Sequence, residues 1–332
     1  MSNLATDEAV IAAATSGDEH AFAELAQRHR RELHVHCYRM LGNFEDAEDV
    51  VQDTLVRAWR AKDTFVGTGF RAWLYKIATN ACLDTIRRKQ RQVPRLDSFA
   101  EVPWLQPYPD HLLDQVAPVE AGPAATVVAK ETIELAFLAA IQLLPAQQRA
   151  ILILREVLDW SAKEAADLLE TTVAGVNSAL QRARATLRTR LPERDEHRPA
   201  SDPTDLERSL LQRYIDAHER GDPSAITELV RDDIRITMPP RPWCYDGIAS
   251  LAPLFQAAFG GSHGDWLLVP TSANRQLAAA NYLRAPGDDL YRAFKIDVVR
   301  FAGDRIAEVT TFDNTLFDAF GLPPTVTPGG SR

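Results

Sequence analysis

The sequence predicts a multidomain protein in which two all-α modules are followed by one α+β module. In the first half, two stretches repeat apolar residues at helical spacing, and a proline-rich segment at 92–128 separates them. After a polar break at 192–205, helices give way to the period-two alternation of strands. The length of 332 residues suits two or three domains. We therefore predict domains at 1–91, 129–191 and 206–322, linkers at 92–128 and 192–205, and a flexible tail at 323–332.

The composition limits what the chain can do alone. A net charge of −9 and a pI near 5.4 argue against a protein that coats DNA unaided, because like charges repel the duplex. Cys37, Cys82 and Cys244 lack disulfide or zinc-knuckle spacing, and His34 and His36 point to different sides of a helix. We predict no metal and no cofactor. With no signal peptide and no apolar span of membrane length, we expect a cytoplasmic protein.

The first informative element is a helix from Asp46 to Trp59 that is apolar on one face and acidic on the other. The apolar stripe is predicted to be buried, and it comprises Ala47, Val50, Val51, Leu55 and Ala58. The acidic face comprises Glu45, Asp46, Asp49, Gln52 and Asp53. Such a face is common on solvated helices, and it equally suits a basic protein partner.

A second helix, from Phe70 to Arg91, has a strongly basic last turn. Cations there suit the helix macrodipole, and they could equally hold phosphate. Trp73 and Tyr75 add aromatic surface on which a base could stack. The loop before the helix, Asp63 to Gly69, has two glycines that serve either as simple helix breakers or to admit an extruded base.

The segment from Leu143 to Leu191 reads as a compact helical module. Ser161 and Glu164 form a capping box at the start of a short helix, and a turn at Thr171 and Thr172 precedes a longer helix. In the longer helix we predict a buried face of Val176, Leu180, Ala183, Leu187 and Leu191, and an outward face of Ser178, Gln181, Arg182, Ala185 and Arg188. This is helix-turn-helix geometry, although a bundle fragment with a basic face would share the pattern.

The order DAEDVVQDTLVRAW, then FRAWLYKIATNACLDTIRR, resembles region 2 of the extracytoplasmic-function group of bacterial sigma-70 proteins, from about Asp18 to Arg91. The resemblance implies that the first helix docks on the β′ clamp of RNA polymerase core and that the second opens and reads the −10 promoter element. The implied core-polymerase contacts are Asp46, Glu48, Asp49, Gln52 and Asp53. The implied −10 contacts are Trp73, Tyr75, Asn80, Asp84, Arg87 and Arg88.

The stretch LLPAQQRAILILREVLDWSAKEAADLLETTVAGVNSALQRARATLRTRL resembles region 4 of the same family. That region reads the −35 element and contacts the β flap of polymerase. The implied −35 residues are Thr172, Ala174, Asn177, Ser178, Gln181, Arg182, Arg184 and Arg188. The family motif has Lys and Arg where this chain has Asn177 and Ala179, which predicts weaker backbone binding with a flatter salt dependence.

Six prolines mark 92–128 as an extended linker that is poor in helix. Its Trp104 and Tyr108 are aromatics that an inert spacer does not require. In the family this linker threads toward the active cleft and the RNA exit path of polymerase. Alternatively, the two aromatics pin the linker to another domain of the same chain.

The C-terminal module begins with helices at 206–220, 223–230 and 248–259, with a strand at 234–238 among them, and ends in hairpin strands within 266–285 and 290–311. From Leu206 to Phe320 it resembles the SnoaL-like branch of the nuclear transport factor 2-like cone fold. Some relatives are isomerases or cyclases with an acid-base carboxylate. The candidate polar groups here are Asp246, His218, Asp297 and Asp313. A possible pocket is formed by Trp243, Tyr245, Phe294 and Asp313.

Three classes of function compete: a sigma factor, a helix-turn-helix repressor that binds paired sites without polymerase, and an enzyme with accessory helices. Only the first explains both helical modules, their order and the linker, so we expect a non-enzymatic sigma factor that associates with the nucleoid when bound to polymerase. We expect the C-terminal domain to organise the two DNA-facing modules and so modulate activity. The alternatives for that domain are a small-molecule sensor and a vestigial isomerase-like enzyme.

Overall fold

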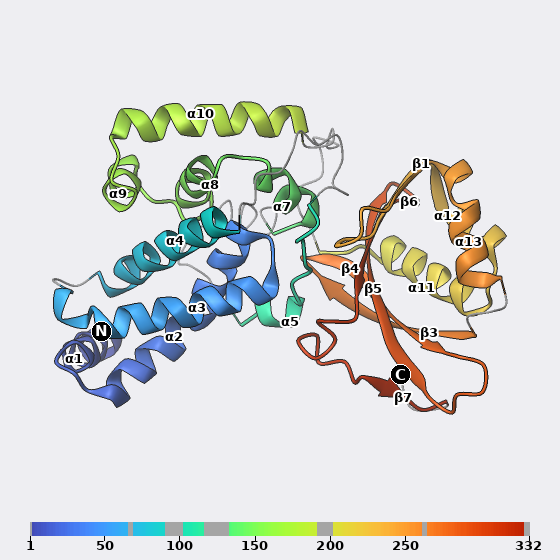
Figure 1. Ribbon diagram of the computed structural model, residues 1–332, viewed down its shortest axis with the longest axis horizontal. Helices are drawn as coiled ribbons and strands as arrows, with labels where there is room; N and C mark the ends of the chain where they lie inside the picture. Colours follow the sequence, from blue (N-terminus) through green and yellow to red (C-terminus); the bar gives the residue numbers. More distant parts are fainter. Residues whose placement is uncertain are drawn as a thin grey trace. The chain divides into compact units, whose positions relative to one another are not determined.

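The computed structural model describes residues 2–65, 69–89, 102–115, 133–190, 202–260 and 264–328 (Figure 1). The chain divides into two compact units. The first unit contains residues 1–94 and 112–199, and the second contains residues 95–111 and 200–332. Part of the predicted linker therefore belongs to the C-terminal unit.

The N-terminal part of the first unit consists of α1 (Ser2–Thr15), α2 (Glu19–Leu41), α3 (Phe44–Arg60), the 3₁₀ turn η1 (Lys62–Thr64) and α4 (Phe70–Arg88). Local signals set these boundaries. The Asp18 side chain accepts hydrogen bonds from the backbone N–H groups of His20 and Ala21 at the start of α2, and Gly42 ends α2 with φ 68°. Asn43 then caps α3. Helices α2, α3 and α4 pack on one another.

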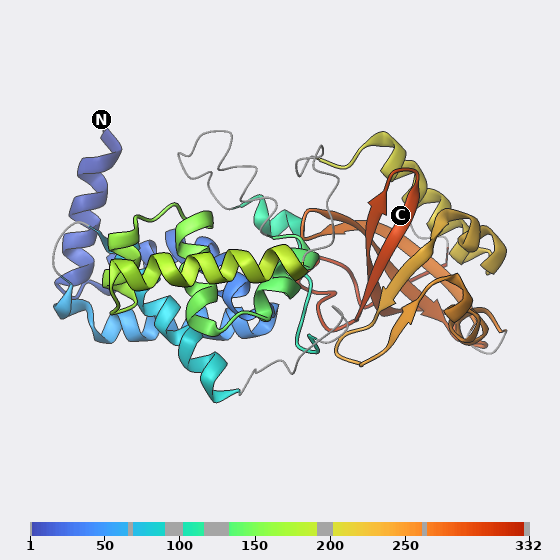
Figure 2. The same cartoon turned by 90° about the horizontal axis from the view of Figure 1, so that it is seen from above.

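The second half of the unit contains α7 (Leu135–Gln142), α8 (Ala146–Leu152), the π-helical turn η3 (Ile153–Val157), α9 (Ala162–Leu168) and α10 (Val173–Arg190). The predicted capping box is confirmed, since Ser161 and Glu164 exchange side-chain and backbone hydrogen bonds. Figure 2 shows α10 as a long helix over α8 and α9, with which it packs. The predicted linker is not wholly extended, because it contains the short helix α5 (Asp110–Leu113).

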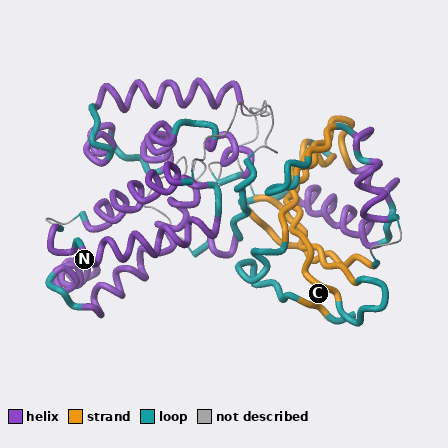
Figure 3. The backbone as a smooth tube through the Cα atoms, in the orientation of Figure 1, coloured by secondary structure: helices purple, strands orange, loops and turns teal. Residues whose placement is uncertain are grey.

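The second unit is a curved sheet with α11 (Asp205–Glu219), α12 (Pro223–Leu229), the 3₁₀ turn η4 (Ile248–Ser250) and α13 (Ala252–Phe259). Figure 3 shows the helices on one side of the strands. The strands are β1 (Val230–Thr237), β2 (Cys244–Asp246), β3 (Asp265–Ala273), β4 (Gln276–Arg284), β5 (Tyr291–Ala302), β6 (Arg305–Asp313) and β7 (Thr325–Val326). Their order is β2-β1-β6-β5-β4-β3, with β7 on β5, and only β1 and β6 pair in parallel among them.

Two features of this unit were not predicted. The stretch 266–285 is interrupted by a tight turn at Asn274 and Arg275, which have φ of 57° and 61°. Two successive positive φ values match the type I′ hairpin turn, whose sequence usually contains glycine. The predicted flexible tail at 323–332 was wrong in part, because its residues Thr325 and Val326 form β7 and pair with β5.

Candidate functional site

The α3 helix has the two faces that its sequence predicts. Ala47, Val50, Val51 and Ala58 are buried, and Leu55 is partly buried. The opposite face exposes Glu45, Asp49, Gln52 and Asp53, together with Val56, a large apolar residue that is 46% exposed. This helix therefore presents a mixed acidic and apolar surface.

Cations of the same unit already hold several of these acids. Asp46 is paired with Lys89, and Glu48 is paired with Arg30. Arg57 lies between Asp53, at 2.7 Å, and Asp84 on α4, at 3.3 Å.

Asp49 has no ion pair within the described residues and is exposed. The pairs of Arg57 with Asp53 and Asp84 are exposed to solvent and therefore weak, whereas the Asp46 side chain in the pair with Lys89 is only 12% exposed.

Most of the predicted residues of α4 lie at its surface. Asn80, Asp84, Arg87 and Arg88 are exposed, whereas Trp73 is partly buried between Phe65 and Phe70. Residues 66–68 of the loop before α4 lie outside the described residues, as does Arg91.

The prediction that Tyr75 faces DNA was wrong. Its side chain is 2% exposed, its hydroxyl donates to Glu32 Oε2 at 3.2 Å, and burial raises the pKa of its phenol. Tyr75 follows Leu74 on α4, and both side chains are buried in the unit. The Tyr75 ring is therefore a core group and not a platform for bases.

In the helix-turn-helix, the two faces of α10 agree with the sequence. Val176, Leu180, Ala183 and Leu187 are buried, while Leu191 lies outside the described residues. The Thr172 hydroxyl accepts a hydrogen bond from the backbone N–H of Gly175. The predicted −35 residues are all exposed: Thr172, Ala174, Asn177, Ser178, Gln181, Arg182, Arg184 and Arg188. Arg184 pairs with Glu156.

In the second unit, the β3–β4 turn binds the linker. The Asn274 Oδ1 atom accepts from the backbone N–H of Tyr108 at 2.8 Å, and the Asn274 N–H donates to the Tyr108 carbonyl at 2.9 Å. Asp110 accepts from the N–H of Arg275 at 2.8 Å, and Pro109 forms a bridge with Ala273. Tyr108 and Asn274 are completely buried. For Tyr108, the structure therefore supports the interpretation in which the linker is pinned to another domain, through the Tyr108 backbone.

A polar cluster is buried within the same unit, around Asp297 on β5. The Asp297 carboxylate pairs with the Lys295 ammonium at 2.7 Å. It also accepts hydrogen bonds from Thr311 at 2.7 Å, Asn281 at 3.0 Å and Tyr214 at 3.3 Å. Burial alone would raise the pKa of Asp297, but Lys295, His218 and the hydrogen bond from Thr311 outweigh it and hold the pKa below its usual value. A carboxylate so fully paired is a poor proton acceptor.

The other predicted pocket residues lie elsewhere. Trp243 is 47% exposed and stacks with Arg241, and Asp313 is exposed, where it caps Thr315. Phe294 is 45% exposed and packs edge-on against Trp266. Tyr245 packs against the core but does not join the Asp297 cluster. The predicted pocket was therefore wrong for Trp243 and Asp313.

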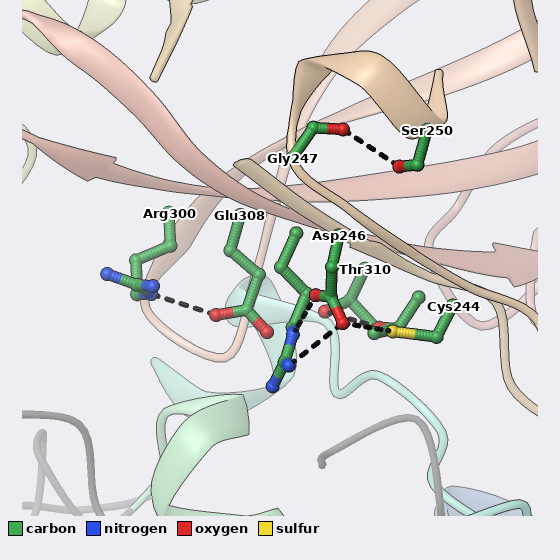
Figure 4. A network of polar contacts seen from close by, with 9 residues as sticks. Cys244, Asp246, Gly247, Ser250, Arg300, Glu308 and Thr310 are labelled. Carbon is green, nitrogen blue, oxygen red and sulfur yellow. Dashed lines mark hydrogen bonds and ion pairs between the residues drawn. The ribbon is translucent and has the colours of Figure 1, made fainter. Parts of the chain in front are cut away.

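Asp246 belongs to a row of alternating charges across four strands. It pairs with Arg235 on β1, which lies beside Glu308 on β6, and Glu308 pairs with Arg300 on β5 (Figure 4). The hydrogen bond from Arg235 lowers the pKa of Asp246. This carboxylate therefore links strands and has no property of a general acid.

Three buried histidines make both units sensitive to acid. Burial lowers the pKa of His34 to about 4, of His36 to about 3 and of His218 to about 3. Below pH 6.5 the unfolded chain binds protons that the folded chain does not, so stability falls as the pH falls from about 6.5 toward these values. At pH 5 each histidine should cost about 2 kcal/mol. We expect urea unfolding at pH 7 and pH 5 to show this loss, and His218→Phe to reduce it.

His34 and His36 do point to different sides of α2, toward Phe44 and Tyr75 respectively. Among the described residues, no group of three or more His, Cys, Asp or Glu side chains is placed to hold a metal ion. In the part of the chain that the structure describes, every helix is too short or too polar to cross a lipid bilayer.

Family comparisons cover most of the chain. Residues 25–92 match the model of sigma-70 region 2, residues 134–187 match sigma-70 region 4, and residues 211–309 match the SnoaL-like domain. The ECF RNA polymerase sigma factor SigG of Mycobacterium tuberculosis is 41% identical over 318 residues, which span 91% of this chain and 84% of SigG. The sigma factor SigW of Bacillus subtilis is 32% identical over 53% of this chain and 91% of SigW.

A solved structure shares the fold. The crystal structure of the Mycobacterium tuberculosis extracytoplasmic function sigma factor SigJ matches 91% of this chain and 99% of its own, with a TM-score of 0.59 and 20% identity. At that identity the likeness concerns the arrangement of the backbone alone.

Proposed function

Because this chain belongs to the extracytoplasmic-function (ECF) RNA polymerase sigma factors and carries a SnoaL-like C-terminal domain, we propose a role for each of its surfaces. Sigma factors of this family bind RNA polymerase. The exposed acids Asp49 and Asp53, with Val56 beside them, are the proposed contacts to the β′ clamp. Asp46, Glu48 and Gln52 flank them. The mixture of charge and one exposed apolar side chain suits a protein interface, in which the charges at the rim steer the approach of the partner electrostatically.

Promoter DNA is the proposed ligand of the basic surfaces. On α4, Arg87 and Arg88 are exposed at the C-terminal turn and supply charge for the −10 strand, with Asn80 nearby on the same helix. On α10, the polar residues near the N-terminus would meet base edges, and the arginines would hold phosphates. Asn177 is exposed where the family has a cation, which supports weak −35 binding.

For the SnoaL-like domain we propose that it modulates the factor by holding the linker between regions 2 and 4. The observation that carries this proposal is the double hydrogen bond between Asn274 and the backbone of Tyr108, which is completely buried. Backbone contacts of this kind hold a segment whatever its side chains, as in the addition of a strand to a sheet. When part of the linker is held in this way, fewer of its residues are free to extend, and this limits how far the two DNA-binding regions can separate.

Releasing the linker is therefore expected to raise run-off transcription several-fold when the factor is limiting. Asn274→Gly keeps the positive φ of the turn and removes only the side chain that accepts from Tyr108. The matched control is Asn274→Asp, which retains an acceptor and tolerates the same backbone conformation. Activity would be measured with core polymerase over a range of factor concentrations, beside a chain that ends near Leu191. Equal activity of all four proteins at every concentration would refute the modulating role.

A further inference from the structure

The exposed side of α10 carries an uncharged stripe between two arginines. The buried side of the helix is formed by Val176, Ala179, Leu180, Ala183 and Leu187. Because successive residues turn by about 100° around an α-helix, the opposite side centres on Gln181 and on the alanines about two turns before and one turn after it. The uncharged stripe consists of exposed residues: Ala174, Asn177, Ser178, Gln181 and Ala185. Arg182 and Arg184 flank the stripe, at about 80° to either side of its middle.

Two carboxamides supply most of the hydrogen-bonding capacity of the uncharged stripe. Asn177 and Gln181 are four residues apart in α10, so their side chains lie on the same face of the helix, one above the other. Among the described residues, neither side chain makes a hydrogen bond or an ion pair, so both amides are available to a ligand. Each amide combines a carbonyl acceptor with an amino donor in a fixed geometry. The stripe therefore offers two paired donor–acceptor groups and no charge.

The arginines on the two flanks are placed for phosphate rather than for bases. Arg184 forms an ion pair with Glu156 in η3, which fixes its guanidinium at the edge of the stripe. Arg182 lies on the other flank and is exposed. When a helix enters the major groove, its middle meets base edges and its two flanks meet the phosphate backbones. Cations at both edges and amides between them match this order of phosphate and base.

The turn before α10 fixes the start of the helix. The Thr172 hydroxyl accepts a hydrogen bond from the Gly175 N–H at 3.0 Å. A Cβ atom at Gly175 would lie 3.0 Å from the Thr171 hydroxyl oxygen and 3.2 Å from that of Thr172, so the two threonine side chains close tightly over the first turn. Asn177 lies in this first part of the helix. Its position is therefore well held, as a side chain that makes two hydrogen bonds to one base requires.

We propose that Asn177 and Gln181 each read an adenine in the −35 element. The carboxamide accepts a hydrogen bond from the adenine N6 amino group and donates one to N7, a pair of partners that no other base offers in the major groove. Lysine, which the family has at the position of Asn177, carries three donors and no acceptor and therefore pairs with the two acceptors of guanine instead. Ala179, the other departure from the family motif, is 6% exposed and lies on the buried side, so it leaves the stripe unchanged. This inference rests on the proposed function of region 4.

The geometry of the helix also limits how far apart the two adenines lie. Four residues rise about 6 Å along an α-helix, at about 1.5 Å per residue. Stacked base pairs are about 3.4 Å apart, so the two amides reach bases no more than about two base pairs apart. Ala174 and Ala185, at the ends of the stripe, present only methyl groups, which suit contact with the methyl group of thymine. The expected −35 element therefore has a short core of A·T base pairs.

Transcription from a randomised promoter library tests this assignment. The full-length factor and core polymerase would transcribe templates with random sequence upstream of the start site, and the transcripts, each with a barcode for its template, would be counted by sequencing. We expect adenine at two positions of the upstream element, each preferred over the next best base by about ten-fold. Guanine at both positions, or the absence of any upstream element from the factor-dependent promoters, would overturn the proposal.

Two substitutions should exchange the preferred bases. Asn177→Lys is expected to change one adenine preference to guanine and to leave the other, whereas Gln181→Lys is expected to change the other one. The control is Arg182→Gln, which should lower transcription from all promoters alike and flatten the salt dependence by about one phosphate contact, with the same preferred bases. Adenine preferences that persist in both lysine variants would overturn the proposal. If none of the proteins gave a factor-dependent transcript, the proposed function would be refuted, and this inference with it.

Discussion

Replacing Asp49 and Asp53 by lysine is expected to abolish binding of this sigma factor to core polymerase. Both carboxylates are exposed on α3, and the double change shifts the local charge by +4 while leaving the buried stripe intact. Like charges brought together in an interface cost several kcal/mol, so the affinity should fall by 100-fold or more. Arg57 also loses its closer partner, which adds a further cation to the face. Fluorescence anisotropy with labelled factor and core polymerase measures the loss.

The matched control is the pair Asp289→Lys and Asp304→Lys. Both residues are exposed in hairpin turns of the SnoaL-like domain, so the net charge changes equally at a different place. This control should bind core polymerase with an affinity within about two-fold of that of the unchanged protein, because residues outside an interface contribute little to the binding energy. If both double substitutions lowered the affinity for core polymerase equally, net charge rather than the acidic face of α3 would govern binding. The proposal that α3 lies in the interface would then be wrong.

The second large effect is expected from Asp297→Ala, which should destabilise the SnoaL-like domain by about 3–5 kcal/mol. The substitution leaves the Lys295 ammonium, 17% exposed, without its carboxylate, and it removes the acceptor of Thr311 and Tyr214. Breaking one side of a buried ion pair strands the other charge in a medium that solvates it poorly. Hydrogen exchange of β4, β5 and β6 should report the loss directly, since these strands surround the cluster.

Asp313→Ala serves as the control for this experiment. Asp313 is exposed and accepts hydrogen bonds only from Thr315 among the contacts described, so its removal should cost about 1 kcal/mol or less. Equal destabilisation by the two alanine variants would mean that the buried cluster contributes no more than a surface cap. A loss confined to Asp297→Ala would support a structural role for the charged pair.

The helical part of the fold was predictable because its signals are local. The capping box at Ser161 and the spacing of Val176, Leu180 and Ala183 are each contained within a few turns of helix, and helical periodicity reports burial directly. Tyr75 was misassigned for a physical reason. A basic helix end with nearby aromatics looks the same whether the rings face solvent or a neighbouring helix, and only the position of Glu32 on α2 decides between them.

In the second unit the predicted helices and strands are present, but the polar cluster was only partly foreseen. Asp297 and His218 were candidates, whereas Lys295, Asn281 and Tyr214 carried no signal in sequence because they come from three different elements. The turn at Asn274 lacks glycine, so its two positive φ values were not apparent. Sequence alone also left open where the linker binds, since that depends on the register of β3 and β4.

The contact between Asn274 and the Tyr108 backbone also sets the effective concentration of the SnoaL-like domain near region 2. From Lys89, at the end of α4, to Tyr108, which Asn274 holds, the chain has 19 residue steps, which span at most about 65 Å. Within a sphere of that radius, one molecule corresponds to about one millimolar. Any complementary surface of region 2 therefore meets the SnoaL-like domain at millimolar effective concentration, whatever the amount of protein in the cell. An affinity too weak to detect between separate domains would suffice to occupy such a surface for much of the time.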